Sequence, residues 1–387
     1  MDANGRIYLD YAATTPVDRR VQAAMEPYFS DLFGNPSSIH FYGQQAEAAL
    51  ENARQTVAKS LKCMPEEIIF TACGTESDNL AIRGAALAMR KKTGANRLLV
   101  SPVEHHAVSK TAEQLRDEFG FELDYLPVDE FGRVDPKDVL KRLDRNSALV
   151  SVIYANNEIG TVNPIAEIGE ICAQKRVPFH TDAVQAAAHL PMDMASTPVS
   201  LMAIGAHKFY GPKGVGALYY RKGTPLLPIL TGGGHEFGLR AGTQNIPYIA
   251  GLAKAFQLAQ DEINQRRQHV QPLRDRVIGT VLEEIPNAKL TGHPSERLPN
   301  HASFVFEGVD GNELLMMLDV AGFACSSGSA CKTGNPEPSE VLTAIGLSRS
   351  WALGSLRVTM GMGTSAGQVE AFLHELPVAV ARCRRNS

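Results

Sequence analysis

Short apolar segments alternate with amphipathic helical segments along residues 1–260, and this alternation constrains the fold more than any other feature. The apolar segments predict strands at 67–71, 97–101, 121–127, 148–154, 177–180, 201–204 and 215–220. Helical spacing of apolar residues is clearest at 44–61, 76–89, 106–118, 136–142 and 165–174. Strands and helices that alternate in this way build a largely parallel sheet covered by helices, so the sequence predicts an α/β fold.

The pattern changes after Thr243. A helical stretch over 246–285, with a kink expected near Pro272, leads into a segment of mixed strand and helix. A chain of 387 residues is also long for one simple core. We therefore expect a large domain over 1–260, which includes an extended N-terminal arm, and a smaller α+β domain over 261–387.

Composition argues against several classes of protein. The net charge of −4 and the lack of a basic stripe give no signal for nucleic-acid binding. No apolar run approaches the roughly 18 residues that span a bilayer, and the charged start of the chain does not resemble a secretory signal. The six cysteines are sparse and include no C-x-x-C pair, so we expect a soluble protein of the reducing cytoplasm.

Polar groups follow four predicted strands, at the edge where open α/β sheets bind ligands. These groups lie at 73–76, 104–106, 180–185 and 205–208. In the first of them, Gly74 and Thr75 lie where a strand turns into a helix. Backbone N–H groups and a hydroxyl at such a position suit a phosphate, and an ordinary N-cap threonine is the alternative.

Lys208 and Asp182 are the main candidates for chemistry at this edge. A lysine after a strand can form a Schiff base where desolvation lowers its pKa, although surface lysines are commoner and Lys213 is expected to face solvent. Asp182 ends a buried strand, where a carboxylate needs a partner such as a protonated pyridine nitrogen, or caps a helix. His180 and Asp182 alternate along this strand, but no other spacing supports a metal site, so we expect none.

A candidate nucleophile lies in the second domain. Residues 325–336 read Cys-Ser-Ser-Gly-Ser-Ala-Cys-Lys-Thr-Gly-Asn-Pro, a small, polar composition that predicts a mobile loop. Cys331 is next to Lys332, and accessibility beside positive charge favours a reactive thiol, with an incidental exposed cysteine as the alternative. Cys325 is expected to be buried. Arg357 could hold a substrate carboxylate or make a surface ion pair.

Several motifs together resemble those of NifS/IscS-type cysteine desulfurases, which belong to the class V aminotransferases among the fold-type-I enzymes of pyridoxal 5′-phosphate (PLP). They are Tyr-Leu-Asp-Tyr-Ala-Ala-Thr-Thr-Pro at 8–16, Gly-Asn-Pro-Ser-Ser at 34–38, Asn-Asn-Glu-Ile-Gly at 156–160, Ala-His-Lys-Phe-Tyr-Gly-Pro-Lys-Gly at 206–214 and Ser-Ser-Gly-Ser-Ala-Cys at 326–331. The last block separates sulfur-mobilising members from ordinary aminotransferases. The resemblance covers almost the whole chain and implies the fold-type-I architecture.

The resemblance implies a role for each candidate residue. Lys208 would hold PLP as a Schiff base, with Asp182 at the pyridinium nitrogen and Gln185 at O3′. His105 would lie on the ring, with Asn157 nearby. The phosphate would be bound by Gly74, Thr75 and His207, and the phosphate of the neighbouring subunit by Thr243. Thr243 thus implies a homodimer with shared active sites. L-cysteine, held by Arg357 and Asn157, would become L-alanine. Lys208 and His105 would move protons, and Cys331 would take the sulfur as a persulfide for an acceptor protein, such as an iron–sulfur scaffold.

Three positions depart from the family pattern. Gly205 stands where a serine usually bonds the PLP phosphate, which predicts weaker retention of PLP. Phe237 and Met362 stand where arginines are frequent. Thio-modified tRNA and DNA phosphorothioation are alternative destinations for the sulfur. The alternative functions are those of a related class V PLP enzyme, such as a selenocysteine lyase or an aminotransferase, or of a non-catalytic sulfur-delivery adaptor.

Overall fold

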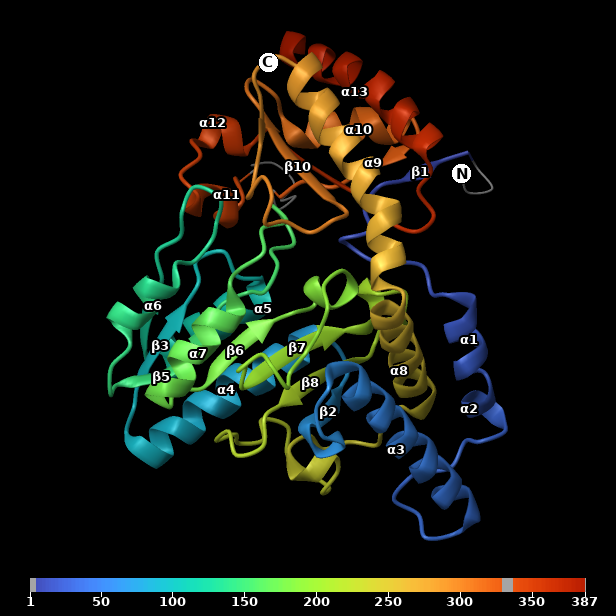
Figure 1. The fold of residues 1–387 in the computed structure, drawn as a ribbon, viewed down its shortest axis with the longest axis vertical. Helices are drawn as coiled ribbons and strands as arrows, with labels where there is room; N and C mark the ends of the chain where they lie inside the picture. Colours follow the sequence, from blue (N-terminus) through green and yellow to red (C-terminus); the bar gives the residue numbers. More distant parts are fainter. Residues whose placement is uncertain (1–4, 329–336, 387) are drawn as a thin grey trace.

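The computed structural model describes residues 5–328 and 337–386. Within these residues, seven strands form one large sheet in the order β2-β8-β7-β6-β5-β3-β4 (Figure 1). They are β2 (Ile68–Thr71), β3 (Arg97–Val100), β4 (Glu122–Tyr125), β5 (Ser147–Ser151), β6 (Phe179–Asp182), β7 (Leu201–Gly205) and β8 (Gly216–Tyr220). Only β8 runs antiparallel to its neighbours within this described sheet. The predicted α/β fold with a mostly parallel sheet is therefore confirmed.

Helices cover both faces of this sheet because its strands are apolar on both sides. One face packs against α3 (Phe41–Leu61), α7 (Ile165–Lys175) and α8 (Ile246–Asp261), and the other against α4 (Gly74–Thr93) and α5 (His106–Phe119). The residues of β2 show the alternation: Ile68 and Phe70 lie in the first core, and Ile69 lies in the second. This alternation is the two-residue period of a strand.

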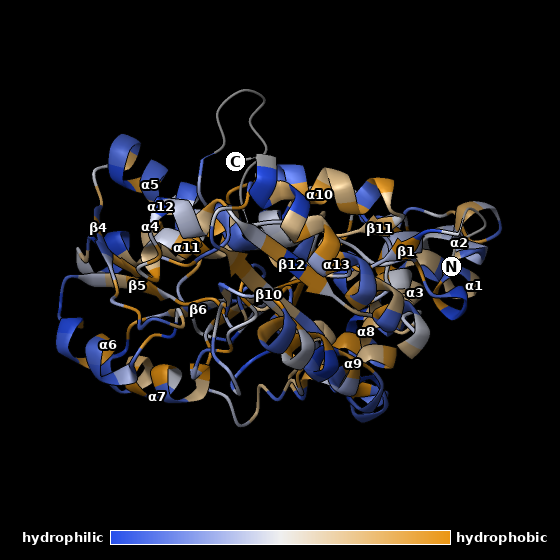
Figure 2. Cartoon of the chain, turned by 90° about the horizontal axis from the view of Figure 1, so that it is seen from above, coloured by the Kyte–Doolittle hydropathy of each residue, from blue (hydrophilic) through white to orange (hydrophobic). Residues whose placement is uncertain are grey.

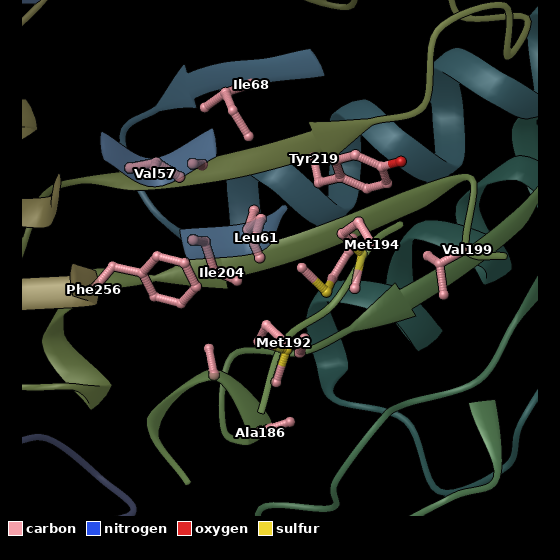
Figure 3. Packing of buried hydrophobic residues seen from close by; sticks show 14 of the residues in the cluster. Val57, Leu61, Ile68, Ala186, Met192, Met194, Val199, Ile204, Tyr219 and Phe256 are labelled. Atoms are coloured by element: carbon pink, nitrogen blue, oxygen red, sulfur yellow. The ribbon is translucent and has the colours of Figure 1, made fainter. Parts of the chain in front are cut away.

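The first of these cores is formed by residues that lie far apart in the sequence. Figure 3 shows Leu61 of α3 and Phe256 of α8 beside Ile204 and Tyr219 of the sheet. Each of the four side chains is almost completely buried. Burial of a large apolar side chain contributes about 1.5–3 kcal/mol, so this layer fixes the strands whose ends form the site.

A smaller antiparallel sheet with the order β12-β10-β9 lies above the large one in Figure 1, within the same described residues. Its elements are β9 (Ala288–Leu290), β10 (His301–Phe306) and β12 (Ser355–Thr359), with α9 (Ile263–Glu284), α10 (Gly311–Val320), β11 (Phe323–Ala324), α11 (Glu340–Ala344), α12 (Arg349–Ala352) and α13 (Ala366–Asn386). Phe304, Leu314 and Phe372 pack in a separate core here. We propose that this part is the smaller domain, residues 261–387.

Hydrophobic residues concentrate inside the molecule. Figure 2 shows hydrophobic colour on β10 and β12 and hydrophilic colour on outer helices such as α5 and α6 (Pro136–Arg142). No helix of residues 5–328 and 337–386 is long and apolar enough to cross a membrane.

The long helical stretch between the two cores breaks at a different place from the one predicted. α9 runs without interruption through Pro272, and the break lies at Glu262, where the backbone leaves helical geometry. Phe256 packs in the core of the large sheet, whereas Val270 packs in the core of the small one. The chain changes direction where it passes from one core to the other, so packing and not the proline sets the break.

The N-terminal arm connects both sheets before the chain enters α1 (Arg19–Met25) and α2 (Pro27–Ser30). Its strand β1 (Ile7–Tyr8) pairs in parallel with β11. Farther along the arm, Asp10 forms a bridge with Thr359 at the end of β12. The arm thus passes from the two-stranded sheet of β1 and β11, beside β12, to the end of β7, where the carbonyls of Ala12 and Ala13 contact Lys208.

Candidate active site

A pocket of about 260 Å³ lies where β6 and β7 end, between the N-terminal arm and Arg357 of β12. The predicted residues that line it are Gly74, Thr75, His105, Asn157, Asp182, Gln185, His207, Lys208 and Arg357. Thr243 does not belong to the pocket that the described residues form. Cys331 lies outside the described residues. The structure therefore assembles most of the predicted site from segments that are distant in sequence.

Lys208 ends the short 3₁₀ turn η3 (Ala206–Lys208) that follows β7. Its Nζ donates hydrogen bonds of 2.7 Å to the carbonyl oxygens of Ala12 and Ala13. Burial, followed by the nearby charge of Arg357, lowers the pKa of Lys208 to about 8. A substantial fraction of the amine is therefore neutral at mildly alkaline pH, as a nucleophilic lysine requires. Lys213 is exposed, as expected.

Asp182 is the last residue of β6 and is buried. Its Oδ1 accepts a hydrogen bond of 2.8 Å from the backbone N–H of Val184. Burial, followed by the carboxylate of Asp78, raises the pKa of Asp182 to about 6. At neutral pH the carboxylate thus remains ionised in a desolvated position, where a cation such as a protonated pyridine would stabilise it.

The buried side chains of His180 and Asp78 lie near Asp182. His180 Nε2 is 3.3 Å from Asp78 Oδ1, and His180 Nδ1 is 2.9 Å from the hydroxyl of Ser151. Burial lowers the pKa of His180 to about 4, so this imidazole is neutral at physiological pH. It adds no positive charge that would compete for Asp182. Sequence reasoning did not single out Asp78, whose position in α4 brings it to the pocket wall.

The N-terminus of α4 forms one end of the pocket. The helix starts at Gly74 with Cys73 as its N-cap residue, so the alternative that Thr75 is an ordinary N-cap is wrong. A Cβ atom on Gly74 would lie 2.7 Å from Cγ2 of Val184, which leaves no room for a side chain. The start of this 20-residue helix therefore exposes backbone N–H groups and the Thr75 hydroxyl to an anion.

Two histidines border the pocket. His105 is the N-cap residue of α5, and its Nδ1 accepts a hydrogen bond of 3.0 Å from the N–H of Ala107. In the neutral ring the proton is therefore on Nε2. Protein atoms packed around His105 desolvate the ring and lower its pKa, although the residue stays accessible to solvent. His207 lies 3.2 Å from the hydroxyl of Thr14, and burial lowers its pKa to about 4.

Arg357 is buried, so the surface ion pair considered from the sequence is wrong. Its Nη2 donates to Asp10 Oδ1 at 2.8 Å, and its Nη1 donates to the backbone carbonyl of Asn157 at 3.0 Å. Nε has no hydrogen-bond partner among the described residues. Arg357 thus presents a desolvated positive charge to the pocket, as the recognition of a carboxylate requires.

Main-chain atoms of the arm are a second part of the site that the sequence did not reveal. The Ala12 carbonyl accepts hydrogen bonds from Lys208 and also from Gln185 Nε2, the latter at 2.7 Å. The only signal available was the motif at 8–16, because alanine side chains carry no chemistry. Cys325, expected to be buried, is partly exposed.

The donors and acceptors of this pocket fit PLP group by group. Lys208 is the amine that can hold its aldehyde carbon, the carboxylate of Asp182 suits the pyridine nitrogen, and the start of α4 suits the phosphate. Each lies at the end of a different strand of the large sheet or directly after it. The fold and the site together define a fold-type-I PLP enzyme.

Comparisons with known proteins identify the family. Residues 7–372 match the family described as Aminotransferase class-V. The chain is 45% identical over 378 residues to "Cysteine desulfurase IscS" of Dictyoglomus turgidum, which covers 98% of this chain and 95% of the relative. It is 44% identical over 384 residues to the protein of the same name from Methanosarcina thermophila, with coverages of 99% and 94%.

A solved structure described as a NifS-like protein superposes with a TM-score of 0.90 at 35% identity, and the match covers 97% of this chain and 100% of the other. The chain belongs to the class-V aminotransferase family, within its NifS/IscS-type cysteine desulfurase group. Like the other members of this family, it is a PLP-dependent enzyme.

Proposed function

We propose that this enzyme converts L-cysteine to L-alanine and transfers the sulfur to Cys331 as a persulfide. The observation that carries the proposal is the convergence of Lys208, Asp182 and Arg357 on one pocket. These residues provide an amine, a carboxylate and a guanidinium, which match the needs of PLP and of an amino-acid carboxylate. Relatives that bear the name cysteine desulfurase align over nearly the whole chain.

Each pocket residue has a part in this reaction. Lys208 holds PLP, and its free amine, with a pKa of about 8, can accept the proton from the substrate Cα. Bound PLP supplies the electron sink that makes this proton acidic. Arg357 pairs with the substrate carboxylate beside Asn157, and Asp182 keeps a negative charge at the pyridine nitrogen. Gln185 would bond O3′, His105 would lie against the ring and exchange protons through Nε2, and His207 would donate to the phosphate.

Sulfur transfer needs no external oxidant. The thiolate of Cys331 attacks the sulfur of the substrate, so that an S–S bond forms as the C–S bond breaks. The electron pair of the C–S bond stays with the carbon fragment, which takes up a proton and leaves as L-alanine. The net change is L-cysteine plus the Cys331 thiol to L-alanine plus the Cys331 persulfide.

We further propose a homodimer in which Thr243 reaches the phosphate site of the partner. Thr243 is exposed and lies away from the pocket of its own chain, which supports a role in a neighbouring one. Large exposed side chains lie in the same segment at Leu230 and Phe237, and in the 29–42 segment at Phe33 and Phe41. Apolar surface of this kind is typical of an interface between subunits.

The destination of the sulfur is a second part of the proposal. We propose that Cys331 passes it to an acceptor protein, such as an iron–sulfur scaffold, in the cytoplasm. The sparse cysteines of the chain support a reducing compartment.

The test compares the wild type with Cys331→Ala, using Cys63→Ala as a cysteine control outside the pocket. Absorbance of bound PLP is recorded before and after L-cysteine, and alanine and reductant-released sulfide are measured in the same sample. Cys331→Ala should keep the PLP absorbance and lose both products, while Cys63→Ala keeps them. Production of alanine and sulfide by Cys331→Ala would favour a related activity such as that of a selenocysteine lyase. A protein that stays colourless after PLP addition would favour a non-catalytic adaptor.

A further inference from the structure

The carboxylate of Asp10 contacts two residues that lie more than 300 positions away in the chain. Its Oδ1 accepts from Nη2 of Arg357 at 2.8 Å, and its Oδ2 accepts from the hydroxyl of Ser326 at 2.8 Å. The side chain of Asp10 is 15% exposed and that of Arg357 is 9% exposed. This ion pair is therefore largely shielded from water, where a charged hydrogen bond fixes geometry more strongly than at the surface.

The backbone around the pair is also held in register. Ser326 and Arg357 exchange main-chain hydrogen bonds of 2.6 Å and 3.3 Å. On the other side, Thr359 N donates to the carbonyl of Leu9 at 2.8 Å. These main-chain hydrogen bonds fix the stretch of the arm that carries Asp10, and so they place its carboxylate beside Arg357.

Two of the three nitrogens of the Arg357 guanidinium donate to protein groups. Asp10 takes one hydrogen of Nη2, and the Asn157 carbonyl takes one hydrogen of Nη1. Nε is buried and has no partner among the described residues. Each of the two Nη nitrogens therefore keeps a second hydrogen that a carboxylate can accept.

We propose that Asp10 is a positioning residue for the substrate carboxylate, because its hydrogen bond to Nη2 fixes the guanidinium of Arg357 at the wall of the pocket. The proposal rests on the proposed role of Arg357 in substrate binding. Asp10 does not line the pocket and acts through Arg357. It also offsets the charge of Arg357, which lies close to the ammonium of Lys208.

The test measures the dissociation constants of L-alanine and of ethylamine, its counterpart without a carboxylate, from the absorbance of the PLP-loaded enzyme. In Asp10→Ala the dissociation constant of L-alanine should rise about tenfold, and in Asp10→Asn, which keeps the shape, by a few fold. The dissociation constant of ethylamine should stay within about twofold in both. A purely structural effect of Asp10 would weaken both ligands alike.

Two further variants make the outcomes distinguishable. Asp18→Asn is the matched control, because Asp18 is another arm carboxylate that pairs with an arginine, at 2.8 Å, but lies away from the pocket. Arg357→Gln tests the assignment on which the proposal rests, and loss of L-alanine selectivity is expected. If Arg357→Gln binds L-alanine as the wild type does, the proposed role of Arg357 fails. If it weakens L-alanine while the Asp10 variants do not, or if they bind L-alanine more tightly, the proposal for Asp10 is overturned.

Discussion

The guanidinium of Arg54 binds both carboxylate oxygens of Glu236, with N–O distances of 2.9 Å and 3.0 Å. The two side chains are 3% and 1% exposed. Glu236 Oε2 also accepts from the backbone N–H of Phe70, at 2.8 Å, so the pair fastens the segment near Thr243 to β2. Glu236 and Phe237 have left-handed backbone angles, with φ of 47° and 58°. The ion pair therefore holds a strained turn in place.

Glu236→Ala should lower the free energy of unfolding by about 3 kcal/mol, because the buried Arg54 loses both hydrogen bonds to Glu236 and keeps only the more exposed Glu51 as an acidic partner. Urea unfolding of the PLP-free protein measures the loss. Glu76→Ala is the matched control, since Glu76 pairs with Arg240 in a less buried position, and a smaller loss is expected there. Equal losses in the free energy of unfolding of the two variants would contradict the prediction that the more buried ion pair contributes more to stability.

Phe237 is one of the departures from the family pattern, and its surroundings offer a reason for it. The Arg54 guanidinium lies 5.0 Å from the centre of the Phe237 ring, a cation–π contact. Phe237→Arg would place a second cation there, so we expect a lower melting temperature, with part of the loss recovered at high salt. Phe237→Tyr should melt like the wild type. A Phe237→Arg variant that is as stable as the wild type would argue against this reason for the phenylalanine.

Gly205 stands where the family usually has a serine, and the structure has room for a serine side chain at this position. A Cβ on Gly205 would lie 3.5 Å from the backbone nitrogen of Gly74 and 3.6 Å from Val184, which are ordinary contacts. Gly205→Ser should therefore fit and add one hydroxyl near the start of α4. We expect PLP to bind about fivefold more tightly, as one added hydrogen bond of about 1 kcal/mol implies. Equilibrium titration of the PLP-free enzyme tests this, and no tightening would count against the hypothesis of weaker retention. Gly74→Ser, which clashes with Val184, should bind PLP more weakly.

The pKa of Lys208, lowered to about 8, predicts the pH dependence of PLP capture. The neutral amine is the reactive form, so the rate of reconstitution should rise about tenfold from pH 7 to pH 9 and then level off. Stopped-flow absorbance of the PLP-free enzyme measures this rate. A rate that keeps rising to pH 10.5 would indicate an unshifted lysine.

The same shift affects stability in a defined direction. Between the folded pKa of about 8 and the unfolded value of 10.5, the unfolded chain binds more protons at this residue. The contribution of Lys208 to the stability of the PLP-free protein should therefore improve as pH rises through this window.

The fold and much of the pocket could be predicted because the informative residues lie at the ends of apolar strands. Asp182 ends β6 and Lys208 closely follows β7, and the strand pattern alone brings such positions to one edge. The motif resemblance then supplied the individual roles that the spacing left open.

What the sequence did not reveal depends on contacts between distant segments. The carbonyls of Ala12 and Ala13 are main-chain atoms with no residue-type signature, yet they bind Lys208. The pairing of Arg54 with Glu236 spans 182 positions, and no local pattern predicts it. Pro272 marks a favoured place for a kink, but the position of the two cores moved the break to Glu262.

The attachment of the arm to β12 has a consequence for biosynthesis. Ala12 N donates to the hydroxyl of Thr359 at 2.9 Å, so this residue of the arm gains its partner only after the ribosome has added 347 further residues. Until then the two carbonyls that hold Lys208 have no fixed place. A nascent chain that stops short of Thr359 therefore lacks a finished pocket, and PLP capture is expected to mark chains whose translation has passed that point.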